Sequence, residues 1–125
     1  MLDAGREAKN CMRVLAKTGT NIVAELIPPA AAFYQWDHYP KGDVFDPATH
    51  AQYYYHAHPE NDRPAEHGHF LTFLRPGGMP KGVAPAPLPD YAPAADPNAA
   101  LAHIAGIAMN EFGAPIKLFT TNRWV

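Results

Sequence analysis

Half of the prolines in this chain fall in one stretch, and that stretch limits where regular structure can form. Residues 76–100 contain seven of the 14 prolines. Proline lacks a backbone N–H and fixes φ, so the stretch cannot be a central strand and favours an extended, polyproline-like backbone. Twenty-five residues without regular structure are unusual inside a compact domain and indicate a lid, a tether or an arm. We expect a proline-rich arm packed over one edge of the fold.

The N-terminal segment, residues 1–29, has the pattern of an amphipathic helix. Its apolar side chains recur at the three-and-four spacing of one helix face. They are Cys11, Val14, Leu15, Ile22, Val23 and Leu26. Asp3 is the expected N-cap, and residues 18–20 could break the helix into two pieces. We expect the apolar face to pack on the rest of the domain, with Cys11 as a small buried hydrophobic residue.

Five short segments rich in aromatic and branched residues predict strands. They are residues 32–39, 52–58, 67–75, 101–110 and 116–125. The last two are joined by a hairpin-length loop that contains a glycine, which indicates an antiparallel meander. We therefore predict one α+β domain over residues 1–125. In it, an N-terminal helix packs on a curved, mostly antiparallel five-stranded sheet that could close toward a small barrel. The first three predicted strands lie within residues 30–75, which contain six of the seven histidines. A C-terminal hairpin occupies 101–125.

Four histidines in two His-x-His pairs are the feature that points to chemistry. His56 and His58 lie in the second predicted strand, and His67 and His69 lie in the third. Because alternate side chains of a strand share a face, a hairpin between these strands could bring all four imidazoles together. His103 could add a fifth imidazole from the fourth strand. Imidazole binds zinc, iron, copper and nickel, so we predict a transition-metal site.

Two further side chains could act at such a site. Glu66 could be a fourth ligand, a general base, or a carboxylate that orients an imidazole. Glu60 could replace it in a two-histidine, one-carboxylate set for iron. Tyr54 shares a face with His56, where it could line a pocket or donate a proton, although alternating aromatic residues in strands more often serve packing. The spacing of both glutamates departs from the His-x-His pattern of cupin barrels.

A second polar and aromatic cluster lies just before these strands. Asp37 could orient His38 as a base. A structural turn around a buried Trp36 is the interpretation we favour.

The charge and cysteine content narrow the class of partner and the compartment. The net charge is -2 and no basic run occurs, which argues against nucleic acid and anionic membrane partners. No apolar run approaches the ~20 residues of a membrane span, and no signal peptide is evident, so we expect a cytoplasmic protein. One cysteine cannot form an intrachain disulfide, which agrees with a reducing compartment. Sheet edges in so small a domain favour a homo-oligomer or a larger complex.

Three functions fit these features. The first is a metal-dependent enzyme, a hydrolase or an oxygenase, that uses the histidine cluster. The second is a binding module that holds a metal ion, haem or a small organic ligand without turnover. The third is an accessory subunit in which the histidines are polar core and the sheet edge and the proline-rich arm dock a partner.

Several phrases of the sequence resemble a family of bacterial proteins of unknown function. They are YQWDHYPKGDV at 34–44, QYYYHAHP at 52–59, EHGHF at 66–70, TFLR at 72–75 and LFTTNRWV at 118–125. The resemblance runs nearly end to end and implies no particular reaction, cofactor or substrate. Family members continue beyond the NRWV phrase into a further helical segment, so we expect this chain to be a short member or the leading part of a longer one.

Overall fold

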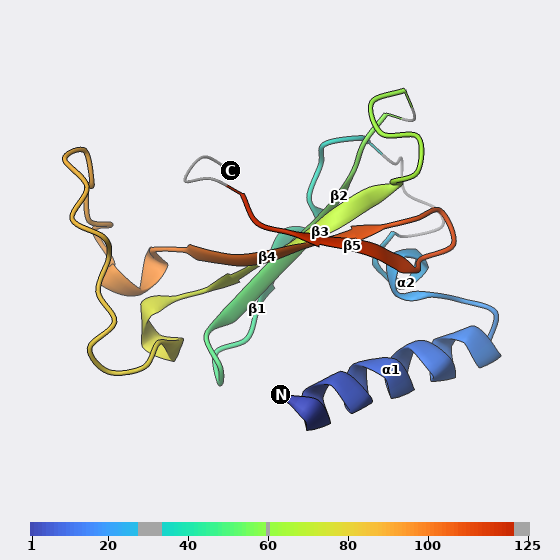
Figure 1. Ribbon diagram of the computed structural model, residues 1–125, viewed down its shortest axis with the longest axis horizontal. Helices are drawn as coiled ribbons and strands as arrows, with labels where there is room; N and C mark the ends of the chain where they lie inside the picture. Colours follow the sequence, from blue (N-terminus) through green and yellow to red (C-terminus); the bar gives the residue numbers. More distant parts are fainter. Residues whose placement is uncertain (28–33, 60, 122–125) are drawn as a thin grey trace.

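The protein has an α+β fold in which two helices lie beside an antiparallel sheet. The computed structural model describes residues 1–27, 34–59 and 61–121 (Figure 1). The helices are α1 (Leu2–Lys17) and α2 (Ile22–Leu26). The strands are β1 (Tyr39–Phe45), β2 (Ala51–Ala57), β3 (Gly68–Leu74), β4 (Ala102–Met109) and β5 (Pro115–Phe119). The predicted antiparallel sheet of five strands is confirmed.

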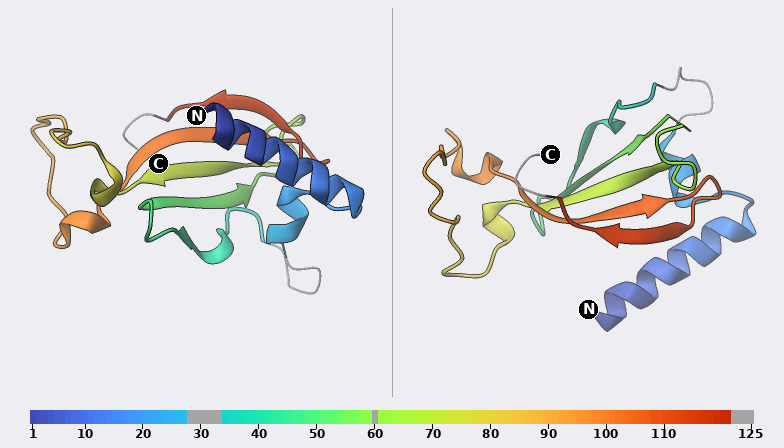
Figure 2. Two further views of the ribbon diagram at one scale, coloured as in Figure 1. Left: turned by 90° about the horizontal axis from the view of Figure 1, so that it is seen from below. Right: turned by 45° about the horizontal axis from the view of Figure 1, so that its top comes forward.

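The sheet is open, so the predicted closure toward a barrel is wrong. The strands follow chain order, β1-β2-β3-β4-β5, and each pairs antiparallel with the next. Figure 2 shows the strands side by side with β1 and β5 at opposite edges. The edge strand β1 pairs irregularly, with a register shift between Tyr39 and Val44. Such irregularity is typical of a sheet edge and does not present a regular ladder to a closing strand.

The N-terminal segment forms two helices, broken where the sequence indicated. Asn21 is the N-cap of α2, and its side chain accepts hydrogen bonds of 3.0 Å from the amides of Val23 and Ala24. The prediction of Asp3 as an N-cap is wrong. The helix begins two residues earlier than that role requires, with Met1 as the cap residue, and Asp3 lies in the first turn, 3.3 Å from Arg6. None of the helices in the described ranges combines the length and apolar composition of a membrane span.

The short helix α2, not the long helix α1, contributes to the core. Val23 of α2 joins a buried cluster with residues of the sheet: Tyr39, Tyr55, Ala57, Phe70 and Met109. No residue of α1 is buried, and Cys11 is exposed, so its predicted burial is wrong. The spacing indicated an apolar face correctly, but it could not indicate what covers that face.

Strands β2, β3 and β4 lie within one residue of their predicted bounds, whereas the outer strands do not. β1 begins where a strand was predicted to end, because residues 34–38 form a turn in which Trp36 adopts a positive φ of 71°. Pro40 and Gly42 are tolerated in β1 because it is an edge strand. β5 ends at Phe119, earlier than predicted. The remaining predicted strand residues, 32–33 and 122–125, lie outside the described residues.

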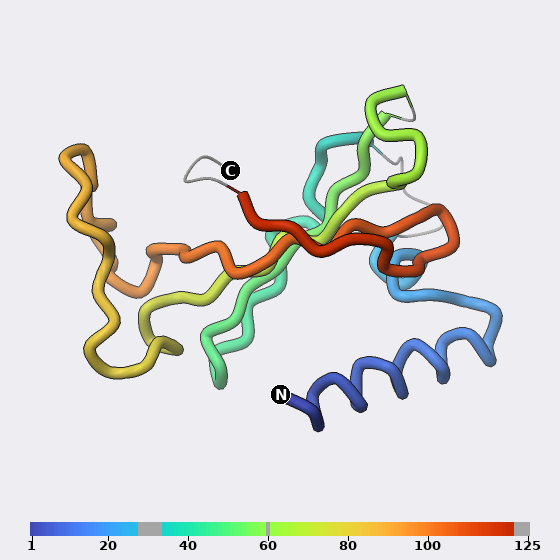
Figure 3. Tube along the Cα trace, in the orientation of Figure 1, coloured from blue at the N-terminus to red at the C-terminus, as the bar shows by residue number. Residues whose placement is uncertain are grey.

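Residues 76–100 form no strand, as the prolines predict. They contain two 3₁₀ turns, Pro76–Gly78 and Pro97–Ala99, and otherwise irregular backbone. Figure 3 shows this segment, coloured yellow to orange, projecting from one end of the sheet. Residues 80–93 are exposed, and the packing of this arm over a sheet edge stays a prediction.

Candidate metal centre

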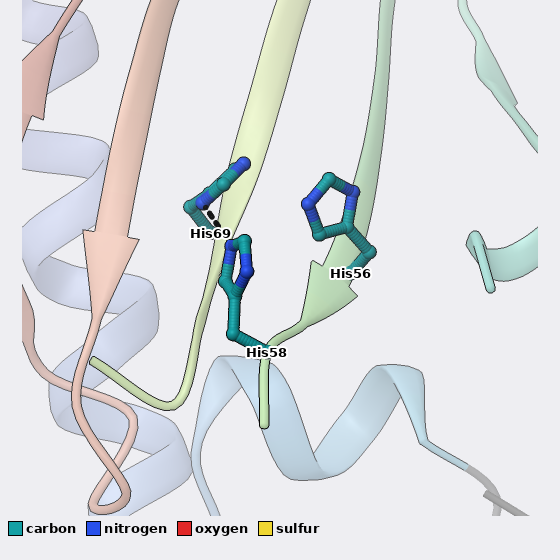
Figure 4. A group of neighbouring side chains, drawn as sticks. All are labelled: His56, His58 and His69. Carbon is teal, nitrogen blue, oxygen red and sulfur yellow. Dashed lines mark hydrogen bonds between the residues drawn. The ribbon is translucent and has the colours of Figure 1, made fainter. Parts of the chain in front are cut away.

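The register of β2 and β3 brings three imidazoles together. His56 lies directly opposite His69, and His58 follows two residues later on the same face. The ring centroids of His56 and His69 are 4.4 Å apart, those of His58 and His69 are 4.7 Å apart, and those of His56 and His58 are 5.0 Å apart. Figure 4 shows the three rings turned toward one another. One ring nitrogen from each lies within 4.8 Å of the other two, a spacing at which one metal ion could be held. We call these three residues the histidine cluster.

A buried carboxylate orients one member of this cluster. Glu66 Oε1 lies 2.9 Å from His69 Nδ1 and 3.1 Å from Arg63 Nη1. When His69 Nδ1 donates its proton to Glu66, the other ring nitrogen keeps its lone pair. Metal-binding histidines commonly have a carboxylate at the second nitrogen, which fixes the tautomer and the ring orientation.

His58 approaches the same nitrogen of His69 that contacts Glu66. His58 Nε2 and His69 Nδ1 are 3.0 Å apart, and both residues are buried. His56 differs, because its ring makes no hydrogen bond with any residue in the described part of the chain. Its lone pair is therefore available to a ligand.

The three imidazoles are neutral at neutral pH. Burial, together with the neighbouring rings of His69 and His58, lowers the pKa of His56 to about 4. Burial also lowers the pKa of His58 and of His69. For Glu66, burial alone would raise the pKa of the carboxyl, but the hydrogen bond from His69 and the charge of Arg63 bring that pKa below its usual value. Neutral imidazoles beside a carboxylate are in the protonation states that metal binding requires.

Aromatic rings surround the histidine cluster. The Trp36 ring lies 4.7 Å from that of His58 and 5.7 Å from that of His56 between centroids, and the Phe119 ring lies 5.1 Å from that of His69. The predicted turn is present, but Trp36 is 54% exposed, so its predicted burial is wrong. The hydrogen bond from its backbone N–H to the carbonyl of Ala57, 3.2 Å long, ties this turn to the end of β2.

Tyr54 lies on the same face, next to the cluster. Its ring stacks on His38 with centroids 3.6 Å apart and lies 5.8 Å from the ring of His56. Burial and the nearby Asp43 raise the pKa of the Tyr54 hydroxyl. This hydroxyl therefore stays protonated at neutral pH.

The structure does not bring His67 and His103 into the cluster. His67 precedes the first residue of β3, so strand alternation does not extend to it, and its Nδ1 lies 2.6 Å from the hydroxyl of Tyr55 on the other face of the sheet. His103 lies opposite Phe73 and 3.2 Å from Thr121 Oγ1 through its Nδ1. Phe73 lies four positions after His69 in β3, which corresponds to roughly 13 Å along the strand. Glu60 lies outside the described residues.

Sequence reasoning missed several neighbours of the cluster. The partner of His38 is Asp43, with 2.9 Å between Nδ1 and Oδ1, rather than Asp37. Asp43 has a positive φ of 59°, and its side chain also accepts a hydrogen bond from Gln52. Phe119 approaches from β5 because Gly106 leaves space for its ring. Neither neighbour carries a motif, since Asp43 contacts His38 through an irregular edge strand and Phe119 meets His69 across the sheet.

Comparison with known proteins adds a family and no function. The sequence model of a family described as "Domain of unknown function (DUF6969)" matches residues 2–125. No curated protein matches the chain, and no solved structure matches it.

Proposed function

This chain belongs to the DUF6969 family, and since that family has no described function, we propose from the side chains themselves that the protein binds one transition-metal ion through His56, His58 and His69. The observation that carries the proposal is the approach of three ring nitrogens to within 4.8 Å. Zinc–nitrogen bonds of ~2.0–2.1 Å in a tetrahedral site separate the ligand nitrogens by roughly 3.3 Å. Side-chain rotations that move the ligand nitrogens by about 1 Å would therefore bring them to the spacing that an ion requires.

A three-histidine site favours catalysis over a purely structural metal. Structural zinc sites use four protein ligands, whereas catalytic sites use three and leave a position for water or substrate. We propose a metal-dependent enzyme, either a hydrolase or an oxygenase. A bound zinc, iron, copper or nickel ion would supply Lewis acidity, an activated water, or a binding position for oxygen.

The contacts of Glu66 and Tyr54 support particular roles. The Glu66 carboxylate already bonds with His69 and Arg63, so we propose that it orients His69 rather than binding the ion itself. Tyr54, with a raised pKa and a ring in the wall of the site, can donate a proton but cannot serve as a base. Trp36 and Phe119 complete the wall and limit the access of water.

A non-catalytic role is the second candidate, and one observation favours it. His69 Nδ1 contacts both Glu66 Oε1 and His58 Nε2, and Glu66 also contacts Arg63, so each of these groups has a polar neighbour within the chain itself. In that case the histidines serve as a polar core, either in a ligand-binding module or in a subunit of a larger complex.

Metal analysis and tryptophan fluorescence test the proposal directly. Protein purified without an affinity tag should contain near-stoichiometric metal, and the variant His56→Ala/His58→Ala should contain none. In a Trp124→Phe background Trp36 is the sole tryptophan, and the short distance from its ring to His58 should make added Cu²⁺ quench its fluorescence. The matched control, His103→Gln, alters a histidine outside the cluster and should keep both signals. A folded protein that neither contains nor takes up metal would contradict the proposal and favour the second candidate.

A further inference from the structure

Helix α1 carries an apolar stripe that the described chain covers only in part, since Met12 and Leu15 are half-buried and the other stripe residues are exposed. At 100° per residue, five small or apolar residues of α1 gather on one side and the basic residues on the other, whereas Leu2, Val14 and Ala16 lie outside this stripe. The stripe consists of Ala4, Ala8, Cys11, Met12 and Leu15, and the basic residues are Arg6, Lys9, Arg13 and Lys17. No residue of α1 is buried. Figures 1 and 2 show α1 set apart from the strands.

A helix of this kind needs a partner to be stable. Isolated helices shorter than ~12–15 residues are marginal in water even when rich in alanine, and most helix stability in proteins comes from packing an amphipathic face. α1 has 16 residues and one glycine, and its cap residue makes no side-chain hydrogen bond. Its own sequence therefore supplies little of the required stability.

The exposed area of the whole chain is large enough to contain an interface. The chain exposes 9046 Å², whereas a compact monomer of 13.7 kDa exposes roughly 6,600 Å². A stable dimer of standard size covers ~800 Å² on each partner, so the excess exceeds what a dimer needs. The exposed segment 80–93 accounts for part of this excess, and the sheet contributes through β5, where Ile116 is 46% and Leu118 is 73% exposed. Leu118 pairs with Ile107, which packs on the core beside α2, so Leu118 faces the side of the sheet that carries α2.

We propose that a second copy of this chain covers α1, with the apolar stripe of each helix packed against that of the other. Positions 4, 8, 11 and 15 have the alternating four-and-three spacing of a helix–helix seam. In a two-fold antiparallel pair, Ala4 lies opposite the second copy's Leu15, and Ala8 lies opposite the second copy's Cys11. At the two ends of the seam, the small residue Ala4 of one copy then meets the larger Leu15 of the other. The basic residues face away from the seam.

The stripe fits another helix better than a lipid surface. Helices that lie in a membrane interface carry large residues such as Trp, Phe and Leu on the apolar face. Three positions of this stripe, Ala4, Ala8 and Cys11, are small. Small side chains allow two helix backbones to approach closely but bury little area in lipid.

Light scattering coupled to size exclusion tests the proposal over a range of protein concentrations. EDTA is present throughout, so that histidines of two molecules cannot be bridged by metal. The full chain should have twice its 13.7 kDa mass. Cys11→Lys places a charge in the seam and should raise the dimer dissociation constant about tenfold or more, since an unpaired charge is costly to bury. Asn10→Lys adds the same side chain on the opposite face of α1 and should leave dimerisation unchanged; helix content by circular dichroism checks both variants.

Three results would overturn the proposal. A monomer at every concentration would remove the second copy as the partner. Equal dimerisation of Cys11→Lys and Asn10→Lys would place the interface away from the stripe. A monomer that binds anionic vesicles, with binding lost in Cys11→Lys, would assign the stripe to a membrane surface instead.

Discussion

The protonation of His56 makes the stability of the fold depend on pH. In the unfolded chain this imidazole takes up a proton near its ordinary pKa of 6.5, but in the folded protein only near pH 4. Between these values the unfolded state binds more protons than the folded state. The unfolding free energy is therefore unaffected by His56 above pH 6.5 and decreases as the pH falls toward 4. Urea unfolding in EDTA should show this loss, and His56→Gln should reduce it. An equal loss of stability in wild type and variant would show that His56 is not its source.

The carboxylate of Glu66 should set the affinity of the proposed site. Glu66→Gln keeps an oxygen that can accept from His69 Nδ1 but removes the charge, and loss of such a partner costs about 10–100-fold in metal affinity. Competition with a chromophoric chelator would measure the change. Glu7→Gln, on exposed α1, is the control and should have no effect. If Glu66→Gln binds metal like the wild type, Glu66 does not orient the site.

For individual residues, the alternation of side chains along a strand predicts some of the proposed ligands and not others. His56, His58 and His69 were predictable because they lie in or directly beside paired strands, where spacing fixes the face. His67 was not, because it lies just before β3 begins, where strand alternation no longer fixes the face of a side chain.

Among the elements, the pairing of β4 with β5 depends on a glycine. A Cβ at Gly106 would lie within 2.3 Å of the Phe119 ring, so the ring must move, and Gly106→Ala should cost about 1–3 kcal/mol of unfolding free energy. A Cβ at Gly5 in α1 would meet no atom within 4 Å, so Gly5→Ala should instead stabilise by up to ~1 kcal/mol. Urea unfolding compares the two variants. If Gly106→Ala is neutral, Phe119 does not pack as described.

The sequence predicted the inner strands well and the edge strands poorly, for a physical reason. Strands β2, β3 and β4 have neighbours on both sides, so their apolar pattern is dense and their bounds are clear. β1 contains Pro40, Gly42 and Asp43, which usually indicate a turn, and only its edge position permits them.

For the whole molecule, local patterns did not reveal how the parts cover one another. The apolar face of α1 was evident from spacing, but whether the sheet or another chain buries it depends on tertiary arrangement. Sheet closure likewise depends on whether two distant edges meet, and no local pattern encodes that.

Metal should stabilise the entire fold, because the proposed ligands come from two strands at the centre of the sheet. An ion that binds only the folded state adds about 2.7 kcal/mol at 100 times its dissociation constant. For a domain of this size that gain corresponds to a rise in the melting midpoint on the order of 10 °C. Calorimetry of metal-loaded and EDTA-treated protein should show this difference, and His56→Ala/His58→Ala should show none. Because His69 Nδ1 keeps Glu66 and His58 as polar neighbours when no ion is bound, the EDTA-treated protein should still unfold cooperatively. A midpoint unchanged by metal in the wild type would mean that no ion bridges β2 and β3.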